Sequence, residues 1–434
     1  MKKYSFRGGI HPHDSKEQTR DIPITILPPA EVMVFPMQQH LGAPCQPIVK
    51  KGDRVKMWQK IGDSDAFMSS PVHSSISGEV IAIEPRLTPN GSMVTSVVIK
   101  NDFKDEICED ICPASENASI KEVIREAGIV GMGGAGFPTH IKLSPPEGKK
   151  VKYIIVNGAE CEPYLTSDHR VMIETPAEVV SGLLKIMSAV NAENAIIAIE
   201  ENKPEAINNI KNAATGTGIK VKVLKTKYPQ GSEKQLINAI TGKQVPSGGL
   251  PIDIGVIVVN IDTCTAIARA YEKGIPLVRR IVTVSGTIIK EPRNFSVRLG
   301  MPIRDVIEAA GGFTEQPAKI LMGGPMMGLS ISSLDIPVVK GTGAILAFDQ
   351  KTVLAPEPTN CIRCGRCVSG CPIHLKPLTI SAYSDMGDFE KCKKSGAMDC
   401  IECGSCTYSC PARRHLVQSI RLAKQKIRAM NVKK

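Results

Sequence analysis

The sequence predicts a multidomain chain of mixed α/β and α+β class, and three observations support this prediction. Its 434 residues suffice for about three domains at roughly 150 residues each. In the middle of the chain, apolar runs that end in polar residues alternate with helical patterns, as in an α/β sheet. Eight of the fourteen cysteines fall near the C-terminus in two copies of one spacing pattern, which sets that region apart as a separate domain.

Charge and hydropathy exclude two classes of protein. The net charge is +11, but aromatic residues make up only 4% and Trp occurs once, so the chain lacks the stacking side chains of a single-strand nucleic-acid binder. The N-terminus MKKYSFRGGIHPHD has no apolar signal-peptide region, and no apolar run approaches the ~18 residues of a membrane helix. We therefore expect a soluble cytosolic chain that binds no nucleic acid.

The first expected domain covers residues 1–110. Residues 35–84 include VKKGDRVKMWQKIG and SSPVHSSISGEVIAI, short strand patterns with Gly and Pro turns that resemble a barrel-sandwich hybrid of the lipoyl or biotinyl kind. The segment GDSDAFMSS between Ile61 and Pro71 contains no lysine, so the attachment point of a swinging arm is missing. We expect a structural or docking module.

A glycine-rich run, GMGGAGFPTHIK, lies in the second expected domain, residues 111–275. It contains the letters G-x-G-x-x-G in Gly131, Gly133 and Gly136, but a predicted helix precedes it and Phe137–Pro138 follow it. A dinucleotide fingerprint needs a strand before and a helix after it. Four glycines in six residues, with Gly134 the fourth, still allow backbone amides to lie close to a flat or phosphate-bearing ligand. A plain tight turn is the alternative.

Polar side chains follow the strand patterns of this domain, and in α/β sheets such positions hold ligands. They are Asn157, Glu160 and Glu162 after the strand expected over Tyr153–Val156, Tyr228, Gly231 and Glu233 in KYPQGSEKQL, and Asn260 and Thr263 after IGVIVV.

The third expected domain, residues 276–354, resembles a soluble-ligand-binding β-grasp (SLBB) module. Residues 282–313, VTVSGTIIKEPRNFSVRLGMPIRDVIEAAGGF, predict two strands, a Pro-initiated helix and a Gly-Gly stop. The segment has no charged cluster, so we expect it to pack between its neighbours. The expected linker to the last domain is APEPTN, residues 355–360.

The last expected domain, residues 355–434, carries the motif C-x2-C-x2-C-x3-C-P twice, in CIRCGRCVSGCP and CIECGSCTYSCP. This spacing is typical of two Fe4S4 clusters, in which the fourth cysteine of each motif ligates the other cluster. Zinc knuckles pair two C-x2-C units without a third cysteine, and disulfides are rare in cytosolic chains. The predicted ligand sets are Cys361, Cys364, Cys367 and Cys410 for one cluster, and Cys400, Cys403, Cys406 and Cys371 for the other.

The C-terminal segment from Pro411 to Lys434 holds eight basic residues and no acidic one. Its apolar residues recur at steps of three and four, which predicts an amphipathic helix with a cationic outer face. The helix either docks on the domain with a solvated face or contacts anionic lipid or an acidic partner. The apolar positions are Leu416, Ile420, Ala423, Ile427 and Met430.

Taken together, these motifs resemble a known family. The run GMGGAGFPTHIKL resembles the flavin loop of the NADH-oxidising flavoprotein subunit of respiratory complex I, and VNGAECEP and YPQGSE resemble the strand-edge motifs that follow it. With the N-terminal GGIHPHDSK and the two cysteine motifs, the chain is similar over nearly its whole length to the C subunit of the Rnf complex (RnfC). That family passes electrons between ferredoxin and NAD, coupled to Na+ or H+ movement in membrane partners.

The resemblance implies FMN at the glycine loop, with a nicotinamide stacked on the flavin. The chain departs from the complex I pattern at Ala159 and Ser232, where acidic residues are usual. The implied FMN contacts are Gly131, Gly133, Gly134, Gly136, Lys142, Asn157, Glu160, Tyr228, Gly231, Asn260 and Thr263, and the implied NAD contacts are Phe137, Glu162 and Glu233.

The expected function is that of a peripheral electron-transfer subunit on the cytoplasmic side of the cell membrane. NADH releases two electrons as a hydride and a cluster accepts one, so a flavin must stand between them. We therefore expect no catalytic acid, base or nucleophile. The implied partners are NAD(H), the membrane subunits and ferredoxin-like subunit of the complex, and indirectly ferredoxin. Two alternatives remain: a cobalamin-reductase-like flavin and iron-sulfur protein, and an electron-wire scaffold that binds no nucleotide.

Overall fold

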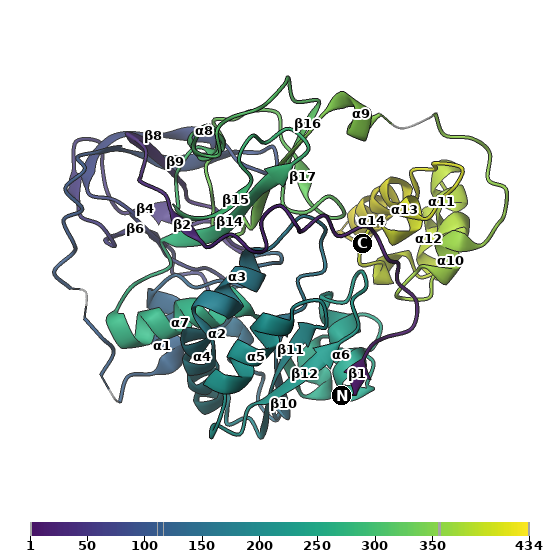
Figure 1. Cartoon of the computed structure of the whole chain (residues 1–434), viewed down its shortest axis with the longest axis horizontal. Coiled ribbons are helices and arrows are strands. Elements are labelled where there is room, and N and C mark those ends of the chain that lie inside the picture. The colour runs from purple at the N-terminus through teal and green to yellow at the C-terminus, as the bar shows by residue number, and fades with distance from the viewer. Residues whose placement is uncertain (1, 111, 116, 355–356, 433–434) are drawn as a thin grey trace.

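The structure is a computed structural model that describes residues 2–110, 112–115, 117–354 and 357–432. The described residues do not include two expected domain boundaries, residues 111 and 355, nor Pro356 of the expected linker, nor the last two lysines. Figure 1 shows a strand-rich region and a second sheet above, a helix-covered sheet below, and a helical lobe at the right that contains the C-terminus.

A five-stranded parallel sheet forms the centre of the second region. Its inner strands are apolar on both faces, so helices cover both sides. Ile155, Ile196 and Val258 pack against α6, while Ile154 and Ile197 belong to the large core under the helices of the opposite face. The strands, in sheet order, are β1 (Lys3–Tyr4), β12 (Lys220–Leu224), β11 (Asn194–Glu200), β10 (Tyr153–Gly158) and β13 (Val256–Asn260).

One helix of this region was predicted by its sequence pattern, and a short one was not. The helix predicted before the glycine run is confirmed as α1 (Ile120–Glu126), with the Ser119 side chain accepting from the amide of Glu122. A single helical turn, α2 (Thr139–Lys142), follows Pro138, where the sequence indicated only a broken loop. The others are α3 (Ser167–Glu174), α4 (Pro176–Val190), α5 (Pro204–Ala213), α6 (Glu233–Thr241), η1 (Pro251–Ile254) and α7 (Ile261–Lys273).

The barrel and the β-grasp module are both built from short strands around buried apolar side chains. The barrel has a four-stranded sheet in the order β3 (Val32–Pro36), β9 (Met93–Asn101), β8 (Gly78–Leu87) and β5 (Arg54–Val55), and a three-stranded sheet of β4 (Gln46–Pro47), β6 (Lys60–Asp63) and β7 (Val72–His73). The β-grasp sheet runs β17 (Leu329–Ser330), β16 (Lys319–Met322), β18 (Ala344–Phe348), β14 (Arg279–Gly286), β15 (Arg293–Arg298) and β2 (Thr25–Ile26), with α8 (Ile303–Ala309) and, after the sheet, α9 (Gln350–Val353).

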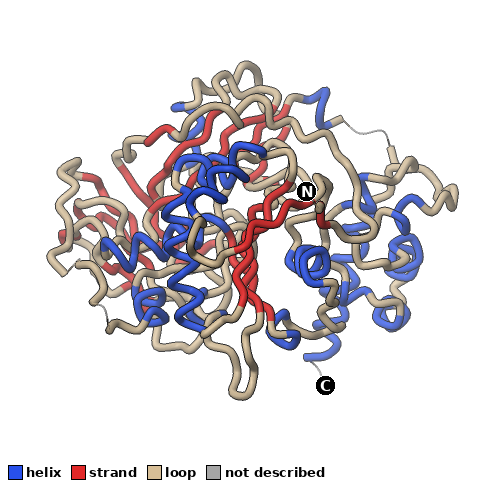
Figure 2. Tube along the Cα trace, turned by 60° about the horizontal axis from the view of Figure 1, so that its bottom comes forward, coloured by secondary structure: helices blue, strands red, loops and turns tan. Residues whose placement is uncertain are grey.

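The N-terminal thirty residues do not stay with the barrel. Residues 3–4 pair in parallel with β12, and residues 25–26 pair in parallel with β15. The first strand therefore extends the parallel sheet and the second extends the β-grasp sheet. Figure 2 shows the N-terminus beside the strands of the parallel sheet, on the side that faces the helical lobe. This segment reaches three of the expected domains before the barrel begins.

The helical lobe contains α10 (Arg366–Ser369), α11 (Pro377–Asp385), α12 (Phe389–Lys394), η2 (Ala397–Asp399), α13 (Ser405–Tyr408) and α14 (Leu416–Val432). The amphipathic helix predicted at the C-terminus is confirmed as α14, and it packs on the lobe through Leu416, Ile420, Ala423 and Ile427. Met430 is 40% exposed, so the apolar face ends one turn earlier than predicted. None of the helices in the described ranges is long and apolar enough to cross a bilayer.

Candidate functional site

The glycine run forms a loop that is fixed on one side and open on the other. The amide of Gly131 donates to the Phe137 carbonyl oxygen at 2.8 Å, and the amide of Met132 donates to Thr263 Oγ1 at 3.1 Å. A Cβ at Gly133 would stand 3.1 Å from Asn260 Nδ2, whereas a Cβ at Gly134 would meet no atom within 4 Å. The loop thus leans on the N-terminus of α7 and presents its opposite side to open space.

The exposed turn of this loop has free donors. Gly133, Gly134 and Ala135 are exposed, and their amides donate to no acceptor within the part of the chain that the structure describes. Unpaired amides beside glycines suit a ligand with a phosphate or a carbonyl-rich ring. The loop therefore fits an FMN group, as the resemblance implies.

The carboxyl ends of β10 and β13 meet beside this loop. Asn157 and Asn260 are register partners on the two adjacent strands, so both side chains leave the sheet at the same edge. Asn157 Nδ2 donates to the Gly231 carbonyl oxygen at 2.7 Å, and Asn260 Nδ2 donates to Asp168 Oδ2 at 2.8 Å. The structure therefore brings the two asparagines, the glycine loop and the Gly231 loop together.

Asp168 is a residue that the sequence did not single out. Desolvation, and then the nearby carboxylates of Glu160 and Asp262, raise its pKa to about 7. It lies on α3 and reaches the strand edge through Asn260. No local pattern marks it, because Asp168 sits within a helix six residues beyond Glu162 and follows no strand.

The acidic residues implied as flavin or nicotinamide contacts already have partners. Glu160 is buried and accepts from the amide of Asp168 at 2.8 Å, which caps the N-terminus of α3. Lys142, an implied FMN contact, and Glu233, an implied NAD contact, form an ion pair with each other at 2.8 Å. Burial raises the pKa of Glu162 to about 7, and its carboxylate accepts from the amide of Met326 at 3.0 Å. Their contacts to a cofactor remain predictions.

Tyr228, another implied FMN contact, is buried where the α/β region meets the helical lobe. It is 1% exposed, and its hydroxyl donates to the carbonyl oxygen of Cys403 at 2.8 Å. Next to it, the amide of Gly231 donates to the sulfur of Cys161 at 3.3 Å, and burial raises the pKa of that thiol. The loop between β12 and α6 therefore connects the Asn157 edge with the helical lobe.

The eight motif cysteines fall into two groups that cross the motifs. Burial, followed by the neighbouring thiols of Cys400, Cys403 and Cys371, raises the pKa of Cys406 to about 12, so Cys371 lies with the second motif. A small, mostly apolar pocket is lined by Cys361, Cys364, Cys367 and Cys410. The thiols thus fall into the crossed groups that the spacing predicted, while ligation of a cluster by either group remains a prediction.

These two groups differ in their surroundings. Cys361 and Cys364 are exposed, and Ile362 between them is 68% exposed. Cys403 instead packs with Ile10, Tyr228, Cys161 and Met326. We call the group of Cys371, Cys400, Cys403 and Cys406 the inner group, and that of Cys361, Cys364, Cys367 and Cys410 the outer group.

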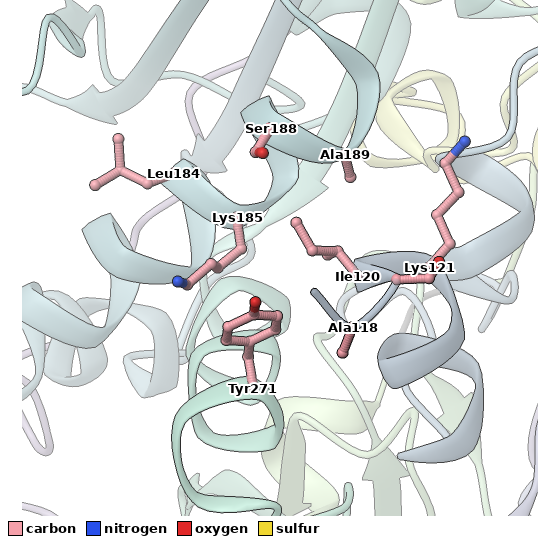
Figure 3. A pocket seen from close by; sticks show the side chains of 9 residues that line it. Ala118, Ile120, Lys121, Leu184, Lys185, Ser188, Ala189 and Tyr271 are labelled. Carbon is pink, nitrogen blue, oxygen red and sulfur yellow. The ribbon is translucent and has the colours of Figure 1, made fainter. Parts of the chain in front are cut away.

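A separate hollow lies away from the glycine loop. Figure 3 shows Lys185 and Ser188 of α4 facing Tyr271 of α7 and Ile120 of α1. The Lys185 ammonium stands 4.2 Å from the Tyr271 ring centroid. None of the predicted site residues lines this hollow, so it offers no alternative place for the predicted chemistry.

Four family models match successive parts of the chain. They describe the RnfC barrel sandwich hybrid domain (residues 4–104), the Nuo51 FMN-binding domain (residues 124–269), the SLBB domain (residues 281–330) and a 4Fe-4S binding domain (residues 358–384 and 397–413). These matches confirm the predicted fold class and the predicted FMN and iron-sulfur cofactors. The exact domain boundaries remain predictions.

The chain is also similar to curated proteins over nearly its whole length. It is 51% identical to the C subunit of the proton-translocating ferredoxin:NAD(+) oxidoreductase complex of Clostridium ljungdahlii, over 98% of this chain and 94% of that one. It is 48% identical to the Na(+)-translocating counterpart of Acetobacterium woodii, over 100% and 99%. It is 43% identical to the C subunit of the ion-translocating oxidoreductase complex of Rhodobacter capsulatus, over 98% and 84%.

Proposed function

Since the chain belongs to the RnfC family, the C subunits of ion-translocating ferredoxin:NAD+ oxidoreductase complexes, we propose that it exchanges hydride with NAD(H) and passes single electrons onward. FMN, when bound, supplies the conversion between a two-electron hydride and single electrons, and the Fe4S4 clusters carry the single electrons. The side chains and amides of this protein bind and orient these groups and keep water away from the junction between them.

One observation carries this proposal: the predicted sites follow one another in space. Hydrogen bonds lead from Asn157 to the inner group, and Cys406 of the inner group packs in one apolar cluster with Cys367 of the outer group. Asn157, at the edge beside the glycine loop, donates to Gly231, and Tyr228 of the same loop donates to Cys403. The outer group ends this series at the surface, where Cys361 and Cys364 are exposed. A site for a nucleotide, a buried cysteine group and an exposed one therefore form a continuous route.

The glycine loop supplies the positive potential that an anionic flavin or its phosphate requires. The amides of Gly133, Gly134 and Ala135 belong to exposed residues and have no acceptor among the described residues, and Lys142 lies on the helical turn that follows. Each hydrogen bond to a charged group contributes about 1.5–3 kcal/mol. We infer that Glu233 holds Lys142 in place, because the two side chains are paired.

The outer group is the proposed contact with another subunit. Arg363, Arg366 and Arg413 surround it and are exposed, so the surface there is cationic and suits an acidic partner. We infer that the chain is a peripheral subunit on the cytoplasmic side of the membrane, where it meets the membrane subunits and the ferredoxin-like subunit of its complex.

Anaerobic reconstitution of the full chain tests the proposed function. We expect one extractable FMN, eight iron and eight sulfide per chain, bleaching of the flavin by NADH, and NADH-driven reduction of a viologen or ferricyanide. Clusters without flavin, or a bound flavin that NADH does not bleach, would contradict the proposal and favour the electron-wire scaffold.

A further inference from the structure

The junction between the flavin-binding region and the inner group is built around one buried hydroxyl. Tyr228 Oη donates to the carbonyl oxygen of Cys403 at 2.8 Å and stands 3.5 Å from Glu162 Oε1. The tyrosine belongs to the loop between β12 and α6, whereas Cys403 belongs to the helical lobe. A single side chain thus spans the boundary between the two regions.

The backbone of Tyr228 is held from the other side by the N-terminal segment. Its amide and carbonyl exchange hydrogen bonds with Ile10, at 2.9 and 2.8 Å. Two residues earlier, a Cβ at Gly8 would lie 2.7 Å from the Cys371 carbonyl oxygen, so this backbone rests directly on the helical lobe. The segment that fixes Tyr228 therefore also contacts Cys371, a second member of the inner group.

The β-grasp module closes the third side of the junction. Glu162 accepts from the amide of Met326 at 3.0 Å, and a Cβ at Gly404 would lie 3.1 Å from the Met326 carbonyl oxygen. The loop that carries Met326 is thereby placed between Glu162 and the residue after Cys403. The flavin-binding region, the N-terminal segment and the β-grasp module therefore all contact the inner group or the residue next to it.

Building on the proposed function, we propose that Tyr228 is a positioning residue for electron transfer and not a flavin contact. Its hydroxyl fixes the Cys403 peptide against the flavin-binding region, and Glu162 holds the hydroxyl from behind. The step moves no atom, because the phenolic proton stays on its oxygen and only an electron crosses the junction. With a cluster held at Cys403, a donor to this peptide would also favour an added electron on it, because outer hydrogen bonds tune the reduction potential of a cluster.

The test is Tyr228→Phe in the full chain, reconstituted anaerobically, with both clusters titrated by dithionite and followed by electron paramagnetic resonance. We expect the inner cluster to become harder to reduce, while the outer cluster and the flavin content stay unchanged. After mixing with NADH, cluster reduction should slow by roughly three- to tenfold, as for the loss of about one hydrogen bond. The matched control is Tyr408→Phe, which removes the hydroxyl of a 53% exposed tyrosine on the same short helix as Cys406.

Each other outcome overturns the role. Loss of flavin from Tyr228→Phe with unaltered cluster potentials would make Tyr228 a flavin contact, and unchanged potentials and rates would leave it only a packing residue. If Tyr228→Phe does not assemble its clusters, Glu162→Gln is the second test of the role. The amide of the new glutamine can donate to Tyr228 Oη, and this strengthens the hydrogen bond from that hydroxyl to Cys403. We expect an easier reduction of the inner cluster, and no shift would refute the role. Because dithionite needs neither flavin nor NADH, the result is independent of whether the proposed function holds.

Discussion

Gly134→Phe separates ligand binding at the glycine loop from folding. A Cβ at this position would meet no atom within 4 Å, and exposed substitutions of this kind change stability by about 0.5 kcal/mol or less. A phenyl ring would occupy the space in front of the free amides of the loop. Blocking two charge-assisted hydrogen bonds, at about 1.5–3 kcal/mol each, corresponds to roughly a 10²- to 10⁴-fold weaker flavin affinity.

The assay is fluorescence titration with FMN, together with urea unfolding and an iron count on the same preparations. Gly134→Ala is the graded variant and should weaken FMN less. Ser188→Phe is the control, because it fills the hollow of Figure 3 and should leave flavin affinity unchanged. Wild-type affinity in Gly134→Phe would refute the placement of the flavin, and loss of both clusters along with the flavin would refute the separation of the two regions.

Three further predictions concern packing, ligation and pH. Gly231→Ala should destabilise the chain by about 1–3 kcal/mol, seen as a lower urea midpoint, because its Cβ would lie 2.2 Å from the Ala159 carbonyl oxygen; an unchanged midpoint would contradict this. Cys371→Ala should abolish the electron paramagnetic resonance signal of the cluster bound mainly by the second motif. Loss of the signal of the cluster bound mainly by the first motif would rule out crossed ligation. Burial lowers the pKa of Lys340 to about 7, so between pH 7 and 9 the unfolded chain binds more protons and wild-type stability rises with pH, by up to about 3 kcal/mol. The free energy of unfolding of Lys340→Met should not show this rise. If the difference in unfolding free energy between wild type and Lys340→Met does not change between pH 7 and 9, the lysine has an ordinary pKa and the prediction is wrong.

Local patterns in the sequence were sufficient to predict much of the fold. The strand at Tyr153 and the helix capped by Ser119 are both present, because hydrophobic period and capping act between residues close in sequence. The cysteine spacing predicted the crossed grouping for the same reason, because three of the four cysteines in each predicted ligand set come from one short motif. The strand-edge rule also placed Asn157 and Asn260 together, as their register shows.

Features that depend on long-range contacts could not be predicted in this way. The strand Lys3–Tyr4 has two residues and pairs with residues more than two hundred positions away, so no periodicity marks it. Glu160 follows a strand and was therefore implied as a ligand, but no pattern in the sequence indicated that its carboxylate accepts from the amides of Asp168 and His169 at the start of α3. Similarly, the ion pair of Lys142 and Glu233 depends on the end of α2 meeting the start of α6 in space.

The N-terminal segment holds two loops of the junction in place through hydrogen bonds. Lys16 is 4% exposed, and its ammonium donates to the carbonyl oxygens of Glu160, Glu162 and Leu165. Burying a cation is costly unless it is fully hydrogen-bonded, so these three acceptors must stay where they are. The segment thereby fixes the loop that carries Glu162, just as Ile10 fixes Tyr228. Electron transfer between separate regions requires a constant distance between the electron donor and the acceptor. The N-terminal segment supplies this rigidity because it contacts several regions at once.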